Sequence, residues 1–146
     1  MDLAVLAKEL IDDEGLRLIP YICPAGKLTI GVGHNLTDNG LTRAQRDYLD
    51  FHEPYFDNLR LTETQAMQLF GDDVRDGLIS LRYIFKAFDE FPDELQHILI
   101  NLFHQLGYSR FAGFCNMIIA IKKRDFKEAA KELRDSKLWR EETPRS

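Results

Sequence analysis

Leucine and isoleucine recur at helical spacing at the start of the chain. Their stripe predicts an amphipathic helix over residues 2–13, which Gly15 can end. The residues on the stripe are Leu3, Leu6, Leu10 and Ile11. After Gly15 the period of the hydrophobic residues changes, so the first helix is expected to be short.

The next twenty or so residues alternate in the manner of β-strands. Alternation and β-branched residues predict strands over residues 16–22 and 27–32, and the intervening Pro24 and Gly26 suit a turn. Residues 34–42 show no apolar period and contain the turn-forming run Asp38-Asn39-Gly40. We therefore expect a β-hairpin followed by a loop.

Helical spacing returns in the middle of the chain. Thr42 can cap a short helix that runs through Tyr48. Thr62 and Gln65 have the spacing of a capping box, and a helical stripe follows them. The stripe consists of Met67, Phe70, Val74, Leu78 and Leu81. This helix, expected over about residues 62–82, is long enough to join two lobes.

The last third of the chain is also helical in pattern. Pro92 can begin a helix and Gly107 can end it in the left-handed conformation. Its inward-facing residues would be Leu95, Ile98, Leu99, Leu102 and Phe103. Further helices are expected over residues 111–123 and 126–135, the second capped by Asp125 with Glu128 at capping-box spacing. The sum is a mostly helical α+β domain with one small antiparallel sheet near its start.

Composition narrows the class of protein. A chain of 146 residues fits one domain, and 45% apolar residues exclude wholesale disorder. The longest apolar runs are far shorter than the roughly 20 residues of a membrane span. The N-terminus has no basic leader and no small-residue cleavage site, so we expect no signal peptide. Two cysteines, Cys23 and Cys115, cannot form a disulfide framework.

Charge makes nucleic acid a poor partner. Residues 1–121 hold 18 acidic and 10 basic groups, whereas residues 122–146 hold 6 and 9. An acidic body repels a polyphosphate. The basic C-terminal segment is either a solvated helix face, since its Lys and Glu residues alternate at helical spacing, or a contact for an anionic polymer.

Acidic residues gather where the first predicted helix ends. Asp12, Asp13 and Glu14 lie at the negative end of the helix dipole, which costs about 0.3–1 kcal/mol for each charge. Like charges, the dipole and partial burial would all raise the pKa of Glu14, as a general acid requires near neutral pH. The alternative explanation is a solvated acidic helix end.

Cys23, Thr29 and His34 follow in and after the predicted hairpin. Each has an ordinary structural explanation as well as a chemical one. A lone cysteine is often a small buried residue, strands favour threonine, and His34 is either a hydrogen-bonded structural histidine or a base. Gly31 and Gly33 do not make a dinucleotide fingerprint, because no helix opens directly behind them.

Taken together, these residues have a familiar order. The matching positions are Glu14-Gly15-Leu16-Arg17-Leu18, Tyr21, Gly26 and Thr29-Ile30-Gly31-Val32-Gly33-His34. Later positions are Leu69-Phe70, Asp73, Ile100-Asn101, Gln105, Gly107, Ala112-Gly113-Phe114, Asn116, Glu128-Ala129-Ala130 and Thr143-Pro144. This pattern closely resembles the T-even phage lysozyme family, glycoside hydrolase family 24, over nearly the whole chain.

The resemblance implies an activity and a fold. The activity is that of a muramidase, which hydrolyses the bond between N-acetylmuramic acid and N-acetylglucosamine in bacterial peptidoglycan without metal or organic cofactor. The fold is a two-lobed lysozyme-like one with a saccharide cleft. The N-lobe would cover about residues 14–61, the connecting helix about 62–82, and the helical C-lobe about 83–146 together with the first helix.

The resemblance also implies roles for individual residues. Glu14 would be the general acid that protonates the leaving oxygen, and Thr29 would help to hold the attacking water or the reacting sugar. His34 and Asp73 would form a structural ion pair. Positions lining the family's substrate site align with Asn35, His104, Gln105, Met117 and Glu132.

Cys23 departs from the family pattern, which usually has Asp at this position. An inverting glycosidase needs an acid and a water-activating group about 6.5–9.5 Å apart. An ordinary thiol, with a pKa near 8.5, is only a few per cent ionised at neutral pH. Cys23 can therefore be a weak base, a nucleophile when ionised, or a polar group that places water, and inversion and retention both stay open.

The C-terminus is a second departure from the family pattern. Similar proteins run on past Thr143-Pro144 with a basic helix, whereas this sequence ends at Ser146. We expect a lower melting temperature than that of an extended chain.

The leading hypothesis is a phage or prophage endolysin. We expect a monomer that stays in the host cytoplasm until a holin opens the inner membrane, without stable membrane insertion. One alternative is a peptidoglycan-binding module of lysozyme fold that has lost turnover. The other is a thiol hydrolase that cuts peptide with Cys23 as nucleophile. Its base would be His34, His52, His97 or His104.

Overall fold

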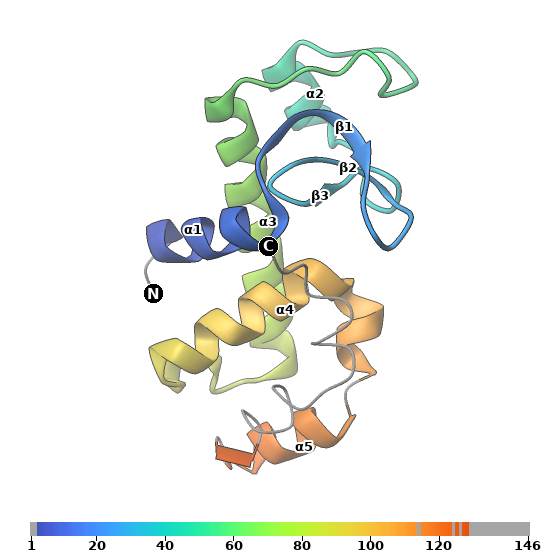
Figure 1. Cartoon of the computed structure of the whole chain (residues 1–146). Coiled ribbons are helices and arrows are strands. Elements are labelled where there is room, and N and C mark those ends of the chain that lie inside the picture. The colour runs from blue at the N-terminus through green and yellow to red at the C-terminus, as the bar shows by residue number, and fades with distance from the viewer. Residues whose placement is uncertain (1–2, 114, 124, 126, 129–146) are drawn as a thin grey trace. The chain divides into compact units, whose positions relative to one another are not determined.

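The computed structural model describes residues 3–113, 115–123, 125 and 127–128 (Figure 1). The chain divides into two compact units, and the division falls inside its longest helix. The first, which we call the sheet unit, comprises Ala7–Asp73. The second, the helical unit, comprises Val74–Arg145 together with Met1–Leu6. The lobe boundaries inferred from the resemblance stay a prediction.

Helix α1 (Leu3–Glu14) ends as its sequence indicates. Gly15 adopts a φ of 84°, and its N–H donates a hydrogen bond of 2.7 Å to the carbonyl of Ile11. A left-handed φ is inexpensive for glycine, so the chain can leave the helix abruptly at this position. The predicted first helix and its glycine stop are confirmed.

The predicted hairpin is confirmed as β1 (Arg17–Ile22) and β2 (Leu28–Gly31), which pair antiparallel. Gly26 closes the turn with a φ of 78° and donates to the carbonyl of Cys23 at 2.8 Å. A third strand, β3 (His34–Asn35), pairs antiparallel with β2 and completes a sheet of order β1-β2-β3.

The prediction of a loop at residues 34–35 was wrong. Gly31 and Gly33 have φ values of 69° and 70° and turn the chain back on itself, so that Thr29 lies opposite Asn35. A strand of two residues is too short to show alternation. It is defined by its pairing with β2 and not by its own sequence.

The predicted caps of the second and third helices both form. Thr42 and Gln45 make a reciprocal capping box at the start of α2 (Arg43–Leu49). Thr62 and Gln65 make a second one at the start of α3 (Glu63–Ile84), with hydrogen bonds of 2.9 and 3.1 Å. The two boxes satisfy backbone N–H groups that the first turn of a helix leaves without partners.

The buried stripe of α3 differs from the expected one at a single position. Met67 is 37% exposed, whereas Ala66 and Leu69 are fully buried. The stripe therefore runs through Ala66, Phe70 and Val74 at intervals of four residues, one position away from Met67. The prediction that Met67 faces the core was wrong.

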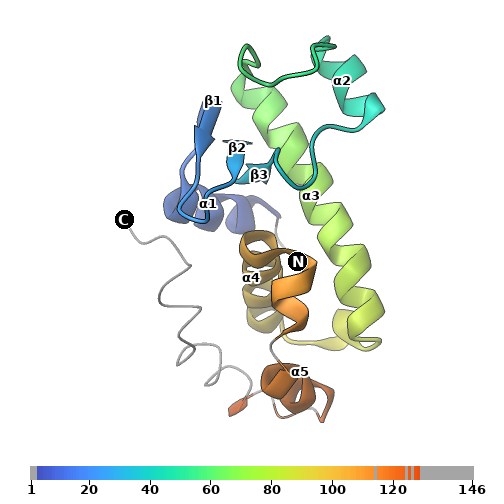
Figure 2. The same ribbon diagram turned by 90° about the vertical axis from the view of Figure 1, so that its right-hand side faces the viewer.

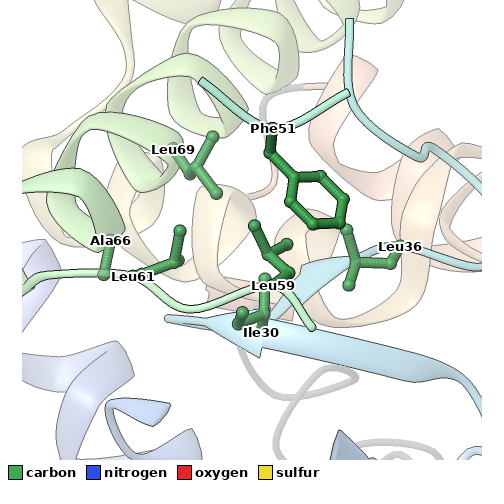
Figure 3. Close-up of a cluster of buried hydrophobic side chains, with 7 residues drawn as sticks. All are labelled: Ile30, Leu36, Phe51, Leu59, Leu61, Ala66 and Leu69. Carbon is green, nitrogen blue, oxygen red and sulfur yellow. The ribbon is translucent and has the colours of Figure 1, made fainter. Parts of the chain in front are cut away.

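One hydrophobic cluster holds the sheet unit together (Figure 3). Ile30 projects from β2 towards Leu59 and Leu61, and Leu69 of α3 and Phe51 approach them from the other side. Each such side chain contributes roughly 1.5–3 kcal/mol by leaving water. Helix α2 lies beside the first turns of α3 in both ribbon views (Figures 1 and 2).

In the helical unit the second part of α3 leads to a 3₁₀ turn, η1 (Phe88–Glu90), and then to α4 (Asp93–Ala112). The rings of Phe85, Phe91 and Phe111 pack against one another with centroids 5.8 and 6.4 Å apart. Of the residues expected to face inward on α4, Leu95, Leu99 and Leu102 are buried, whereas Ile98 and Phe103 are partly exposed.

Gly107 ends the first helical segment of α4 with a positive φ, as predicted, and a second segment follows it directly. Its φ of 77° and ψ of 171° lie in a region that only glycine adopts readily, and the chain then resumes a helical course as far as Ala112. The next helix, α5, spans Cys115–Lys122, so the start expected at residue 111 was wrong.

The last predicted helix, over residues 126–135, lies largely outside the described residues. Its cap is visible, because the N–H of Glu128 donates to Oδ1 of Asp125 at 3.0 Å. None of the helices in the described part of the chain combines the length and apolarity of a membrane span. The predicted class, a mostly helical α+β fold with a small antiparallel sheet and a long helix, is confirmed.

Candidate active site

Thr29 lies on β2 and is buried, with 3% of its surface exposed. Its Oγ1 donates a hydrogen bond of 2.9 Å to the carbonyl oxygen of Lys27. Because a hydroxyl carries only one proton, the remaining capacity of this oxygen is its lone pairs. Thr29 is therefore suited to accept a hydrogen bond from a water molecule or a sugar hydroxyl.

Cys23 begins the turn of the hairpin and is half-buried, with a free thiol. Its backbone N–H donates to the carbonyl oxygen of Lys27 at 2.9 Å. The same oxygen thus accepts hydrogen bonds from Cys23 and from Thr29. Sequence reasoning missed this role of Lys27, since any residue can supply a backbone carbonyl.

The loop after β3 is held to the hairpin by Asp38. Its Oδ1 lies 3.2 Å from Nζ of Lys27, and its Oδ2 accepts from Nδ2 of Asn35 at 2.9 Å. The Asp38 N–H in turn donates to Oδ1 of Asn35. Both ends of the Asn35 amide are thus engaged within the turn, which leaves one amide hydrogen for a sugar. Its contact with substrate stays a prediction.

His34 and Asp73 are 39 residues apart in sequence and in contact in the structure. Nδ1 of His34 lies 2.8 Å from Oδ2 of Asp73, and Nε2 lies 2.8 Å from the carbonyl oxygen of Gly40. A carbonyl and an ionised carboxylate only accept, so both ring nitrogens must donate and the ring is a cation. His34 is 3% exposed, so the pair ties β3 to α3.

Glu14 is the last residue of α1 and precedes the turn at Gly15 that leads into β1. Its side chain lies outside the described residues, and so the expected rise of its pKa stays a prediction. By sequence it is the acidic residue nearest to the hairpin that carries Cys23 and Thr29.

The remaining candidate substrate contacts belong to the helical unit. His104 and Gln105 are half-buried on α4, and Nε2 of Gln105 donates to Oδ1 of Asn101. Oε1 of Gln105 is buried and has no hydrogen-bond partner among the described residues. The side chain of Met117, on α5, and the whole of Glu132 lie outside the described residues.

Within the described part of the chain, no three His, Cys, Asp or Glu side chains converge as metal ligands. The chemistry available in the sheet unit is that of a thiol, a hydroxyl and the carboxylic acid of Glu14. A carboxylic acid with a second polar group is the usual equipment of a glycosidase.

Comparison with known proteins identifies the family. A model of the phage lysozyme family matches residues 12–143. The chain is also 25% identical over 142 residues to a protein of Dictyostelium discoideum named probable T4-type lysozyme 2. This alignment covers 91% of this chain and 83% of that protein. The chain therefore belongs to the phage lysozyme family, whose members are muramidases, glycoside hydrolases that act on peptidoglycan.

Proposed function

We propose that this muramidase is a phage-type endolysin that cleaves between N-acetylmuramic acid and N-acetylglucosamine, with Glu14, Cys23 and Thr29 as its catalytic residues. The observation that carries the assignment is the shared carbonyl of Lys27, which accepts from both Cys23 and Thr29. It holds the backbone of Cys23 and the hydroxyl of Thr29 on one hairpin, directly after the helix that ends with Glu14.

In the proposed reaction Glu14 donates its proton to the glycosidic oxygen as the bond from that oxygen to the sugar C1 breaks. The oxygen of a water molecule forms the new bond to C1. Thr29 accepts a hydrogen bond from this water, and the thiolate form of Cys23 receives the water's other proton and becomes a thiol. The thiol proton then returns to the Glu14 carboxylate through solvent, which restores both groups. Because Glu14 gives up one proton and the water loses one, the overall reaction is a hydrolysis.

The test of catalysis compares Glu14→Gln with Asp12→Asn, a matched exchange at an exposed acid on the same helix. Permeabilised Gram-negative cells are treated with each protein, and clearing of turbidity and release of new reducing ends are measured. We expect Glu14→Gln to abolish both and Asp12→Asn to retain both. Equal activity of the two variants would contradict the role of Glu14.

A non-catalytic binding module would give a different result in the same assay. It would bind isolated cell walls without releasing reducing ends, and Glu14→Gln would change neither quantity. A thiol peptidase would release amino groups instead of reducing ends. The structure argues against His34 as the base of such a peptidase, because both of its ring nitrogens are engaged by Asp73 and Gly40.

The endolysin role implies that the protein waits in the host cytoplasm until a holin admits it to the wall. Its test is expression in Gram-negative cells with and without a co-expressed holin. We expect lysis only when the holin is present, with Glu14→Gln as the inactive control. Rapid lysis without the holin would contradict this route to the wall.

A further inference from the structure

A pocket of about 410 Å³ lies in the helical unit, and none of its described lining residues is a candidate catalytic or substrate-binding residue. It is bordered by the end of α3, the segment that leads to η1, and α5. Its volume falls within the range of about 300–1,000 Å³ that is typical of small-molecule sites. The residues around it separate into an apolar floor and a charged rim.

The floor is formed by Phe85, Phe91 and Ile121, which are 2%, 7% and 0% exposed. The two rings pack with their centroids 5.8 Å apart. These three side chains are almost fully buried, so the apolar surface that water reaches in the pocket belongs mainly to Ile84 and Ala87, which also line it and are partly exposed. Covering this surface gains free energy, because water is displaced from it. The floor therefore favours an aliphatic or aromatic group.

The rim is formed by Tyr83, Lys86 and Lys122, all of which are exposed. The ammonium of Lys86 lies 5.7 Å from the centre of the Tyr83 ring, a cation–π contact that keeps it beside the opening. Among the described residues that line the pocket none is acidic, and neither lysine has an acidic partner there. Two cations that have no acidic partner in the described part of the chain and lie next to an apolar floor are complementary to an anion that carries an apolar chain.

We propose that this pocket binds a small amphiphile with an anionic head group. The head group lies beside Lys86 and Lys122, and the chain lies against the apolar lining at Ile84, Ala87 and Phe91. Fatty-acid anions and anionic phospholipids share this chemistry. The proposal does not depend on the assignment of the catalytic residues.

Isothermal titration calorimetry of the full chain with decanoate tests the proposal, with decanol as the uncharged ligand of equal chain length. We expect saturable 1:1 binding of decanoate and affinity about tenfold lower for decanol, because decanol lacks the negative charge that the two exposed lysines attract. The double variant Lys86→Gln/Lys122→Gln should weaken decanoate about tenfold or more and leave decanol unchanged.

Lys123→Gln is the matched control, because Lys123 is exposed, follows Lys122 directly and does not line the pocket. This variant should bind decanoate like the wild type. Clearing of cell walls by all variants shows that each one is folded. No saturable binding of decanoate, or equal loss in the double variant and in Lys123→Gln, would overturn the proposal.

Vesicles distinguish the two sources of the ligand. Pelleting of the protein with phosphatidylglycerol vesicles, but not with phosphatidylcholine vesicles, and loss of this pelleting in the double variant would identify the lipid as the ligand. Binding of decanoate without pelleting would identify a soluble amphiphile. Both results support the proposed site, whereas the absence of both interactions contradicts it.

Discussion

At the scale of single residues, the hydroxyl of Thr29 offers a direct test of the proposed chemistry. Thr29→Val removes the hydroxyl with little change of volume, and the Lys27 carbonyl keeps its hydrogen bond from Cys23. We therefore expect the free energy of unfolding to fall by about 0.5–1.5 kcal/mol, the net contribution of one hydrogen bond, while turnover falls about a hundredfold. Thr29→Ser, which retains the hydroxyl, should keep most of the turnover. Equal turnover of the two variants would exclude a role for the hydroxyl.

Cys23 is tested by exchange of its side chain while its backbone hydrogen bond is kept. Carboxylic acids are ionised at neutral pH and serine is not. If residue 23 acts as a base, proton transfer to it should become more efficient in Cys23→Asp and be lost in Cys23→Ser. We expect turnover at pH 6–7 to rise several-fold in the first variant and to fall at least about tenfold in the second. If serine supports the same rate as cysteine, the side chain only places water.

We expect the ion pair of His34 with Asp73 to stabilise the fold. Asp73→Asn leaves a buried imidazolium without its counter-charge, which we expect to cost about 3 kcal/mol in urea denaturation. Asp76→Asn is the matched control, since Asp76 is 72% exposed and lies 3.9 Å from Arg75. It should change the free energy of unfolding by less than about 0.5 kcal/mol. Equal effects of the two variants would contradict a stabilising ion pair.

Only some contacts of the candidate site could be predicted from the sequence. The resemblance named His34 and Asp73, which the structure brings together, although 39 residues separate them and no local pattern relates them. Two contacts were not predicted: the hydrogen bond of Asp38 with Asn35, and the hydrogen bond that the carbonyl of Lys27 accepts from Thr29. Such contacts are set by the hairpin turn and cannot be derived from residue types alone.

At the scale of elements, the local signals were the most informative. Capping boxes and glycine stops depend on residues within four positions, so the sequence predicted the caps of α2 and α3 and the end of α1 correctly. Strand β3 was missed because it exists only through pairing with β2. The stop at Gly107 was predicted correctly, whereas the short helical segment that follows it directly, as far as Ala112, was missed.

Two glycines in helices should respond oppositely to alanine. Gly71 in α3 has open space around its missing Cβ and no left-handed φ, so Gly71→Ala should stabilise the fold by about 0.5–1 kcal/mol. Gly107 also has open space, but at φ 77° and ψ 171° an alanine is strained, and Gly107→Ala should cost about 1–3 kcal/mol. Thermal melting of both variants tests this, and a stabilising Gly107→Ala would show that α4 does not need its kink.

At the scale of the whole molecule, family and fold class agree with what the sequence indicated. The family match over residues 12–143 and the mostly helical fold with its small sheet support a muramidase. The predicted substrate contacts stay a prediction. Asn35 is hydrogen-bonded to Asp38, and Glu132 lies outside the described residues.

The most direct measurement is the chemical identity of the ends that the enzyme leaves. Purified peptidoglycan is digested with the wild type, Asp12→Asn or Glu14→Gln, reduced with borohydride and analysed by mass spectrometry. A muramidase with Glu14 as its acid leaves N-acetylmuramic acid at the reducing end, found as the reduced sugar alcohol, with the wild type and Asp12→Asn but not with Glu14→Gln. Reduced N-acetylglucosamine, new peptide amino groups alone, or the same products from Glu14→Gln would contradict the account.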